Sequence, residues 1–113
     1  MERDPAYLLD MLNAAREVQS LSAGLTEEAF RQSKLHQYAL IKLIENIGEA
    51  ARVISAETKA AHPEVPWGAI IDMRNHLVPR YFRIDQALVW DVVQNHIPPL
   101  IARLEPLVPP DTP

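Results

Sequence analysis

Hydrophobic positions recur at helical spacing along most of the chain. A first apolar stripe begins after Asp4-Pro5, where an N-capping residue precedes a proline at the first helical position, and it runs to Gly24 as a C-cap. Thr26 starts a short second helix that carries Phe30. The longest stripe follows i, i+4, i+7 spacing and ends before His62, and its members are Leu40, Ile44, Ile47, Ala51 and Ile54, widened by Leu35, Leu43 and Ala50.

Prolines delimit the helices of the second half. Pro66 precedes an apolar face formed by Trp67, Ile70, Ile71 and Met73. That helix should end near Leu77, because Val78 precedes a proline and is pushed out of the α region. Asp85 caps a last helix, whose apolar positions are Leu88, Val89, Val92, Val93, Ile97, Leu100, Ile101, Leu104 and Leu107. Pro98-Pro99 lies inside this last pattern and predicts a kink or a break there.

These segments predict an all-α fold. Only three glycines occur, and no convincing run shows the alternation typical of a strand. We therefore expect an antiparallel bundle of four or five helices that forms one domain over residues 1–107. A flexible proline-rich tail is expected over residues 108–113. The apolar width of so small a bundle also makes a homodimer plausible.

Composition and charge narrow the functional classes. With 48% hydrophobic and 23% charged residues, the chain has the composition of an ordinary globular protein. It has no cysteine, which excludes disulfides and thiolate metal sites and fits a reducing, cytoplasmic location. No apolar run approaches the roughly 18 residues of a membrane span, and the N-terminus does not read as a signal peptide. A net charge of -4 disfavours a broad cationic surface for DNA, so any nucleic-acid contact should be local.

The strongest candidate for such a contact is the segment of residues 74–83, with the sequence Arg-Asn-His-Leu-Val-Pro-Arg-Tyr-Phe-Arg. Its arginines suit phosphate oxygens, and its tyrosine can stack on a base. Cations also favour the C-terminal end of a helix, where they offset its dipole. The residues alone leave two interpretations open: an anion-binding surface that uses Arg80, Arg83 and His76, or an ordinary solvated helix end.

Several short motifs occur in a specific order across the chain. They are Tyr7-Leu8-Leu9-Asp10-Met11-Leu12, Ile44-Glu45-Asn46-Ile47-Gly48-Glu49-Ala50-Ala51, Pro63-Glu64-Val65-Pro66-Trp67 and Arg74-Asn75-x-Leu77-Val78-x-x-Tyr81-Phe82, followed by Asp85 and Val89-Trp90. In this order and spacing the chain resembles the HepT family of HEPN-domain proteins. Those proteins are toxins of bacterial HepT–MntA toxin–antitoxin modules of type VII.

The resemblance implies a metal-independent endoribonuclease that needs no cofactor and has its site in a homodimer cleft. The family motif is an arginine, four to six residues, then a histidine, usually followed by x-Tyr. By the resemblance, Arg74 with its neighbour Asn75 would steady the charge on the phosphoryl oxygens while a ribose 2′-OH attacks the phosphate of an RNA substrate. The histidine would transfer the proton. An MntA-like nucleotidyltransferase antitoxin would add AMP to the motif tyrosine, here Tyr81.

The chain departs from this motif at one position. Counting from Arg74, the histidine should stand at 79, 80 or 81, and the flanking residues assign it to Pro79. Proline has no titratable group, so catalysis is expected to be impaired. His76 lies two residues after Arg74, about 200° around a helix, which places it on the opposite side. Pro79 fits a natural pseudo-enzyme or a loss-of-function change, and a non-catalytic module that binds RNA or a nucleotide is the alternative function.

The remaining candidates favour structural roles. Glu45 and Glu49 lack the Glu-x-x-His pattern of a di-metal site and are expected to pair with Lys42 and Arg52, so no metal is expected. Asn46 and Glu49 are candidates to support the motif arginine. The three isolated histidines, His36, His62 and His96, are expected to be surface or capping residues. Trp67 and Trp90 are expected to anchor the core or an interface.

Overall fold

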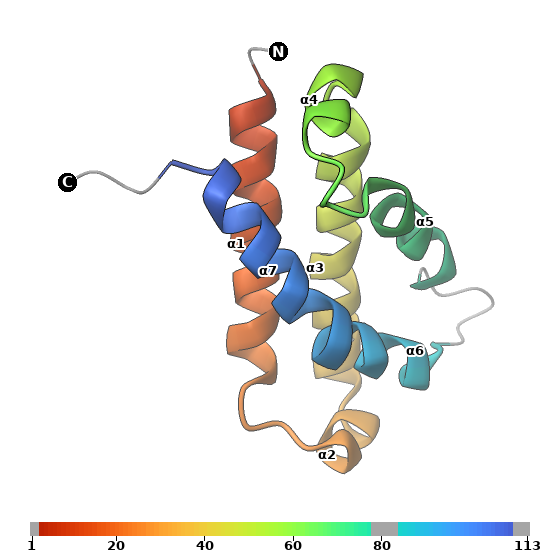
Figure 1. The fold of residues 1–113 in the computed structure, drawn as a ribbon. Coiled ribbons are helices and arrows are strands. Elements are labelled where there is room, and N and C mark those ends of the chain that lie inside the picture. The colour runs from red at the N-terminus through yellow and green to blue at the C-terminus, as the bar shows by residue number, and fades with distance from the viewer. Residues whose placement is uncertain (1–2, 78–83, 110–113) are drawn as a thin grey trace.

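The computed structural model describes residues 3–77 and 84–109, apart from the side chain of Arg74 (Figure 1). The described residues form helices and no strand, which confirms the all-α prediction. In chain order they are α1 (Asp4–Ser22), α2 (Glu27–Gln32), α3 (Lys34–Val53), α4 (Ala56–Ala61), α5 (Trp67–Leu77), α6 (Gln86–Asp91), the π-helix η1 (Val92–His96), α7 (Ile97–Leu104) and the 3₁₀ turn η2 (Glu105–Leu107). None of them is long and apolar enough to cross a membrane.

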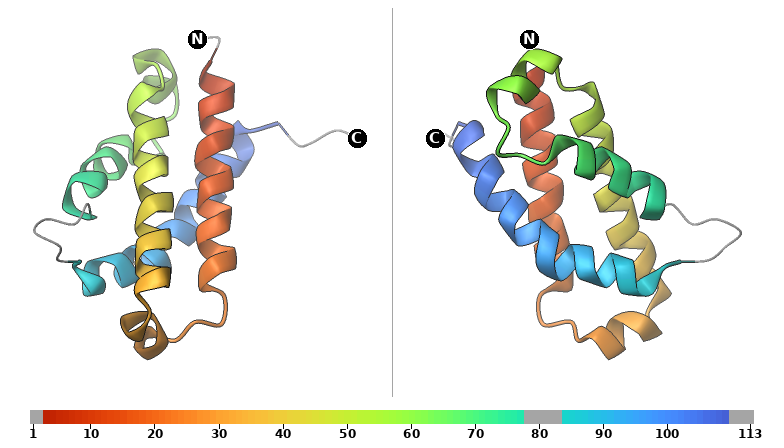
Figure 2. Two further views of the ribbon diagram at one scale, coloured as in Figure 1. Left: turned by 180° about the vertical axis from the view of Figure 1, so that it is seen from behind. Right: turned by 45° about the vertical axis from the view of Figure 1, so that its right-hand side comes forward.

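Helices α1 and α3 form the central antiparallel pair (Figures 1 and 2). Helix α5 packs against α3, and the rod of α6, η1 and α7 crosses the same side of the pair obliquely, with α7 packed on α1. The view from behind shows that none of the other described helices covers the opposite side of α1 and α3. The bundle therefore has two layers, and the core lies between them.

The core matches the predicted apolar stripes with one clear exception. Met11, Leu40 and Leu104 are fully buried, and Phe30 of α2 joins them. Leu35, however, is 78% exposed, so the prediction that it widens the stripe of α3 was wrong. Leu35 stands in the first turn of α3, and no helix packs against that turn on its side.

The start of the chain was also predicted incorrectly in one detail. Asp4 was expected to cap its own helix, but it lies inside α1 and is buried. Its carboxylate instead accepts hydrogen bonds from the Ser55 backbone N–H at 3.1 Å, the Ser55 hydroxyl at 2.5 Å and the Thr58 hydroxyl at 2.6 Å. The Ser55 and Thr58 bonds hold the pKa of Asp4 well below its usual range. This cluster ties the start of α1 to the start of α4.

The same cluster explains why the long helix is interrupted. It was predicted to continue until His62, but α3 ends at Val53 and α4 begins at Ala56. Ser55 has extended backbone and its hydroxyl accepts from the Thr58 N–H, which makes Ser55 the N-cap of a new helix. Its bonds to Asp4 stabilise that break.

The other helix ends follow their local sequence. Gly24 has a φ of 74° just after α1, a conformation that favours glycine. The side chains of Thr26 and Asp85 accept from the N–H groups of Ala29 and Leu88, so both predicted caps are confirmed. Only one feature of the last helix is unusual: before Pro98 and Pro99 it widens into the π-helix η1.

The π-helix is the form taken by the predicted kink. The Ile97 N–H donates to Val92 O, five residues back, and the two prolines occupy the first turn of α7. Prolines are tolerated in a first turn because their missing N–H groups have no partner there in any case. The backbone hydrogen bonds therefore change from the α to the π pattern, and the helix continues through the two prolines. Asn95 and His96 lie in the wider π turn.

Candidate nucleic-acid site beside helix α5

Helix α5 places the motif arginine and its neighbours at the C-terminal end of a firmly anchored helix. Trp67 is buried at the other end, and its indole Nε1–H donates to His62 O at 2.9 Å. Ile70 and Leu77 are buried along the length of the helix. The prediction that this helix starts after Pro66, with Trp67 as a core anchor, is confirmed, and the structure describes the helix as far as Leu77.

Within one copy of the chain, the described side chains of the motif do not converge on a common site. Asn75 and His76 are both exposed. The His76 Nδ1 lies 2.9 Å from Asp72 O, so its ring folds back onto its own helix as a C-terminal capping group. Predictions that concern Pro79, Arg80, Tyr81 and Arg83 fall outside the described residues, as does the side chain of Arg74.

The chain re-enters the core directly after that segment. Ile84 packs partly against the core, and the capped helix α6 follows with Val89 fully buried. Trp90 lies against Phe30 with ring centroids 5.3 Å apart, which confirms Trp90 as a packing residue. The helices on either side of residues 78–83 are thus each fixed to the core.

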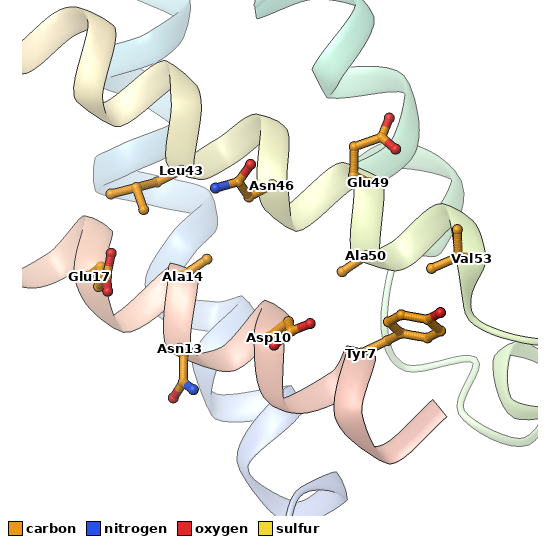
Figure 3. A pocket seen from close by; sticks show the side chains of 10 residues that line it. All are labelled: Tyr7, Asp10, Asn13, Ala14, Glu17, Leu43, Asn46, Glu49, Ala50 and Val53. Carbon is orange, nitrogen blue, oxygen red and sulfur yellow. The ribbon is translucent and has the colours of Figure 1, made fainter. Parts of the chain in front are cut away.

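Two of the hollows in the described part of the chain are candidates for a binding site. The first, here called the α1–α3 groove, has a volume of about 540 Å³ and lies on the uncovered side of the central pair (Figures 2 and 3). Asp10, Glu17 and Glu49 contribute carboxylates to its lining, and none of the described residues that line it is a lysine or an arginine. Such a surface repels phosphate, so the groove is a poor candidate for RNA.

The polar side chains of this groove come from both helices, as Figure 3 shows for Tyr7, Asn13 and Asn46. Glu49 forms the predicted ion pair with Arg52, at 3.3 Å. The role of Asn46 and Glu49 in supporting Arg74 stays a prediction, because the side chain of that arginine is not described.

The second hollow, here called the α5–α7 cleft, has a volume of about 420 Å³ and lies between α3, α5 and the η1–α7 rod. Its apolar lining includes Met73, the residue before Arg74. Its polar lining residues are Asn95, His96 and Arg103, and no described residue that lines it is an aspartate or a glutamate. The cleft therefore adjoins the motif helix. Its ionisable lining residues are basic, whereas those of the α1–α3 groove include three carboxylates.

His96 is exposed, as predicted for a surface histidine, and it also has a side-chain partner that the sequence did not indicate. Its Nε2 lies 3.1 Å from Asp91 Oδ2, while the Asn95 amide donates to Asp91 Oδ1 at 2.7 Å. The hydrogen bond from Asn95, and then that from His96, hold the pKa of Asp91 below its usual value. The spacing i, i+4, i+5 was visible in the sequence, but it joins one helix face only because η1 is a π-helix.

The other two histidines have the local roles expected of them. His36 lies 2.7 Å from the Ser33 hydroxyl at the start of α3, and His62 lies 3.4 Å from Glu64. Within the part of the chain that the structure describes, no group of three or more histidine, aspartate or glutamate side chains is arranged to hold a metal ion.

Comparison with known proteins identifies the family. The family model described as "Ribonuclease HepT-like" matches residues 11–107, which covers α1 from Met11 onward, every later helix and the whole of the motif segment. The chain belongs to the HepT-like family. The motifs from Ile44 onward that suggested this family lie within this match, and the motif of residues 7–12 overlaps its start.

Individual relatives agree with this assignment. The chain is 34% identical to "Putative RNase MJ1380" of Methanocaldococcus jannaschii over 100 residues, which covers 88% of this chain and 92% of that relative. It is 35% identical to "Probable ribonuclease HepT" of Thermococcus cleftensis over 101 residues, covering 89% and 92% of the two chains. No solved structure gives a significant match.

Proposed function

We propose that this protein is the toxin component of a toxin–antitoxin pair, a homodimer that binds RNA through residues 74–83 and cleaves it poorly because Pro79 replaces the motif histidine. The observation that carries the proposal is the sequence of that segment within a chain of the HepT-like family. The anchoring of α5 supports it, since burial of Trp67 and Leu77 fixes the helix whose backbone includes Arg74.

Proline at position 79 is expected to impair RNA cleavage while RNA binding is retained. Attack of a ribose 2′-OH on the adjacent phosphate requires a group that accepts the hydroxyl proton, and proline offers none. Positioned acid–base groups contribute about 10²- to 10⁴-fold to a rate, so we expect a loss of that order relative to a chain with histidine at this position. Arg74 would still hold the phosphate, because its guanidinium stays charged.

Restoring the histidine tests the proposal. Pro79→His is expected to raise the rate of RNA cleavage by about 10²-fold or more, and to arrest growth on expression. The matched control is the double variant Pro79→His, Arg74→Ala, which should fold as well by circular dichroism but lose the gain. If the restored protein stays inert with an intact fold, the toxin proposal fails for this chain.

A second candidate function is favoured by the same proline: a non-catalytic module that binds RNA or a nucleotide and a nucleotidyltransferase partner. Here the partner would modify Tyr81 with AMP. Mass spectrometry after co-expression with an active nucleotidyltransferase, such as one encoded by a neighbouring gene, would detect the adduct on the tyrosine and its absence in Tyr81→Phe. An unmodified Tyr81 would exclude this modification, which the family resemblance implies. Light scattering would test the homodimer.

A further inference from the structure

We propose that the α5–α7 cleft binds one nucleoside monophosphate unit, with its base on the apolar floor and its phosphate at His96 and Arg103. The inference deepens the proposed function and rests on it where the source of that unit is RNA. A free nucleotide presents the same chemistry, and the experiment below distinguishes the two sources.

The floor of the cleft suits a flat, weakly polar ring. It is built from aliphatic and thioether side chains of three helices, namely Ile44, Ile47, Ile70, Met73, Ile97 and Leu100. Several of these are core residues, so the floor is held in place by the packing of the bundle. A volume of about 420 Å³ lies within the usual range for small-molecule sites, roughly 300–1,000 Å³.

The rim supplies the groups that recognise a phosphate. Arg103 is exposed, and its guanidinium has no ion pair or hydrogen bond with any described residue. It therefore keeps its full set of donors for an anion, in a fork that matches phosphate oxygens. Because His96 and Arg103 are seven residues apart, about two helical turns, they lie on the same side of the rod.

Asp91 prepares His96 for this role. The carboxylate engages His96 Nε2 at 3.1 Å and the Asn95 amide at 2.7 Å, which restrains both side chains on the rim. Because Nε2 is bonded to Asp91, Nδ1 is the ring nitrogen of His96 that remains for a ligand. Local widening of a helix into a π turn is frequent at functional sites, and here the π-helix η1 carries these residues.

Charge complementarity selects an anion as the occupant. The chain has a net charge of -4, and carboxylates line the α1–α3 groove. Among the described residues, the ionisable ones that line the α5–α7 cleft are His96 and Arg103, and the carboxylate of Asp91, which bonds to His96, lies outside the lining. An anionic ligand with a flat apolar part fits both the floor and the rim, and a nucleotide has that combination.

Binding measurements on the full chain test the site. Calorimetry would compare 5′-AMP, adenosine and a short single-stranded RNA against wild type, Arg103→Gln and His96→Gln. We expect each substitution to weaken 5′-AMP binding by about tenfold, as for the loss of one charge-assisted hydrogen bond, and to leave adenosine binding unchanged. The matched controls are Arg52→Gln and His62→Gln, which alter an exposed arginine and a carboxylate-paired histidine outside the cleft.

A third variant blocks the cleft sterically. Ala69→Trp enlarges an exposed lining residue without touching the core, and it should abolish 5′-AMP binding while the thermal melt is unchanged. If RNA binding falls in parallel, the source of the nucleotide is RNA; if only 5′-AMP binding falls, it is the free nucleotide.

Two outcomes overturn the inference. The first is that wild type does not bind 5′-AMP, or that Arg103→Gln and His96→Gln bind it with the same affinity as wild type. The other is a change of oligomeric state in Ala69→Trp without loss of nucleotide binding, which would show that a second copy covers the cleft. If RNA still binds wild type in these cases, the proposed function stands without this site. If 5′-AMP binds as expected and RNA does not bind at all, the site stands and the proposed function fails.

Discussion

A buried glutamine joins helix α2 to helix α3, and its replacement gives a quantitative test of the packing between these two helices. Gln37 is 2% exposed, and its Nε2 donates to Phe30 O at 2.9 Å and to Arg31 O at 3.2 Å. Both acceptors are carbonyls at the end of α2, which have no partner within their own helix. Gln37→Met keeps the length of the side chain and removes both donors.

The contacts around Gln37 determine the size of the effect. Phe30 O also accepts from the Ser33 N–H at 3.1 Å, so it keeps one partner in the variant. The bond to Arg31 O is only partly buried, which allows water to replace the lost donor. Each lost bond should therefore cost about 0.5–1.5 kcal/mol rather than a full desolvation penalty, and Gln37→Met should cost about 1–3 kcal/mol in total. Gln37→Ala should cost more, because it also leaves a cavity.

Urea unfolding at a fixed protein concentration measures this loss. The midpoint should fall for Gln37→Met with an unchanged denaturant slope, since the surface exposed on unfolding is the same. The control is Gln32→Met, at an exposed position near the end of α2. A free energy of unfolding for Gln37→Met within about 0.5 kcal/mol of wild type, the range usual for surface changes, would refute the reasoning.

Three further predictions concern other parts of the bundle. Because its hydrogen bonds to the start of α4 depress the pKa of Asp4, the charged form stabilises the fold above the ordinary aspartate pKa of about 4. Wild type should lose this contribution to stability as the pH falls below that value. Asp4→Asn should be less stable than wild type at pH 7, and its melting temperature should fall less over the same pH range. Phe30→Ala removes a fully buried ring that packs on Trp90 and should cost about 3–5 kcal/mol, with a shift of the tryptophan emission; a loss under about 1 kcal/mol contradicts this. The ion pair of Arg16 and Glu105 at 3.2 Å is about half exposed, so Arg16→Gln should cost less than about 1 kcal/mol by urea unfolding, and a larger loss would show a role beyond that pair.

Local signals in the sequence predicted the helices and most of their ends. Thr26, Asp85 and Gly24 were read correctly because capping and left-handed turns depend on a few neighbouring atoms. Leu35 was placed wrongly because periodicity identifies a helix face without showing which turns another helix covers. The motif segment and the missing histidine at Pro79 were also readable from the chain alone, since both depend on residue order.

Contacts between distant segments required the tertiary structure. Asp4 meets Ser55 across 51 residues, and this contact decides both the role of the aspartate and the break between α3 and α4. His96 was isolated in the sequence, yet the structure places it in one cleft with Met73 and Arg103. The sequence thus determined the helices, the family and the altered motif, because these follow from local chemistry and spacing. The cleft, the buried Gln37 and the Asp4 cluster were decided by which helix faces pack together, and that depends on side-chain fit between segments far apart in the chain.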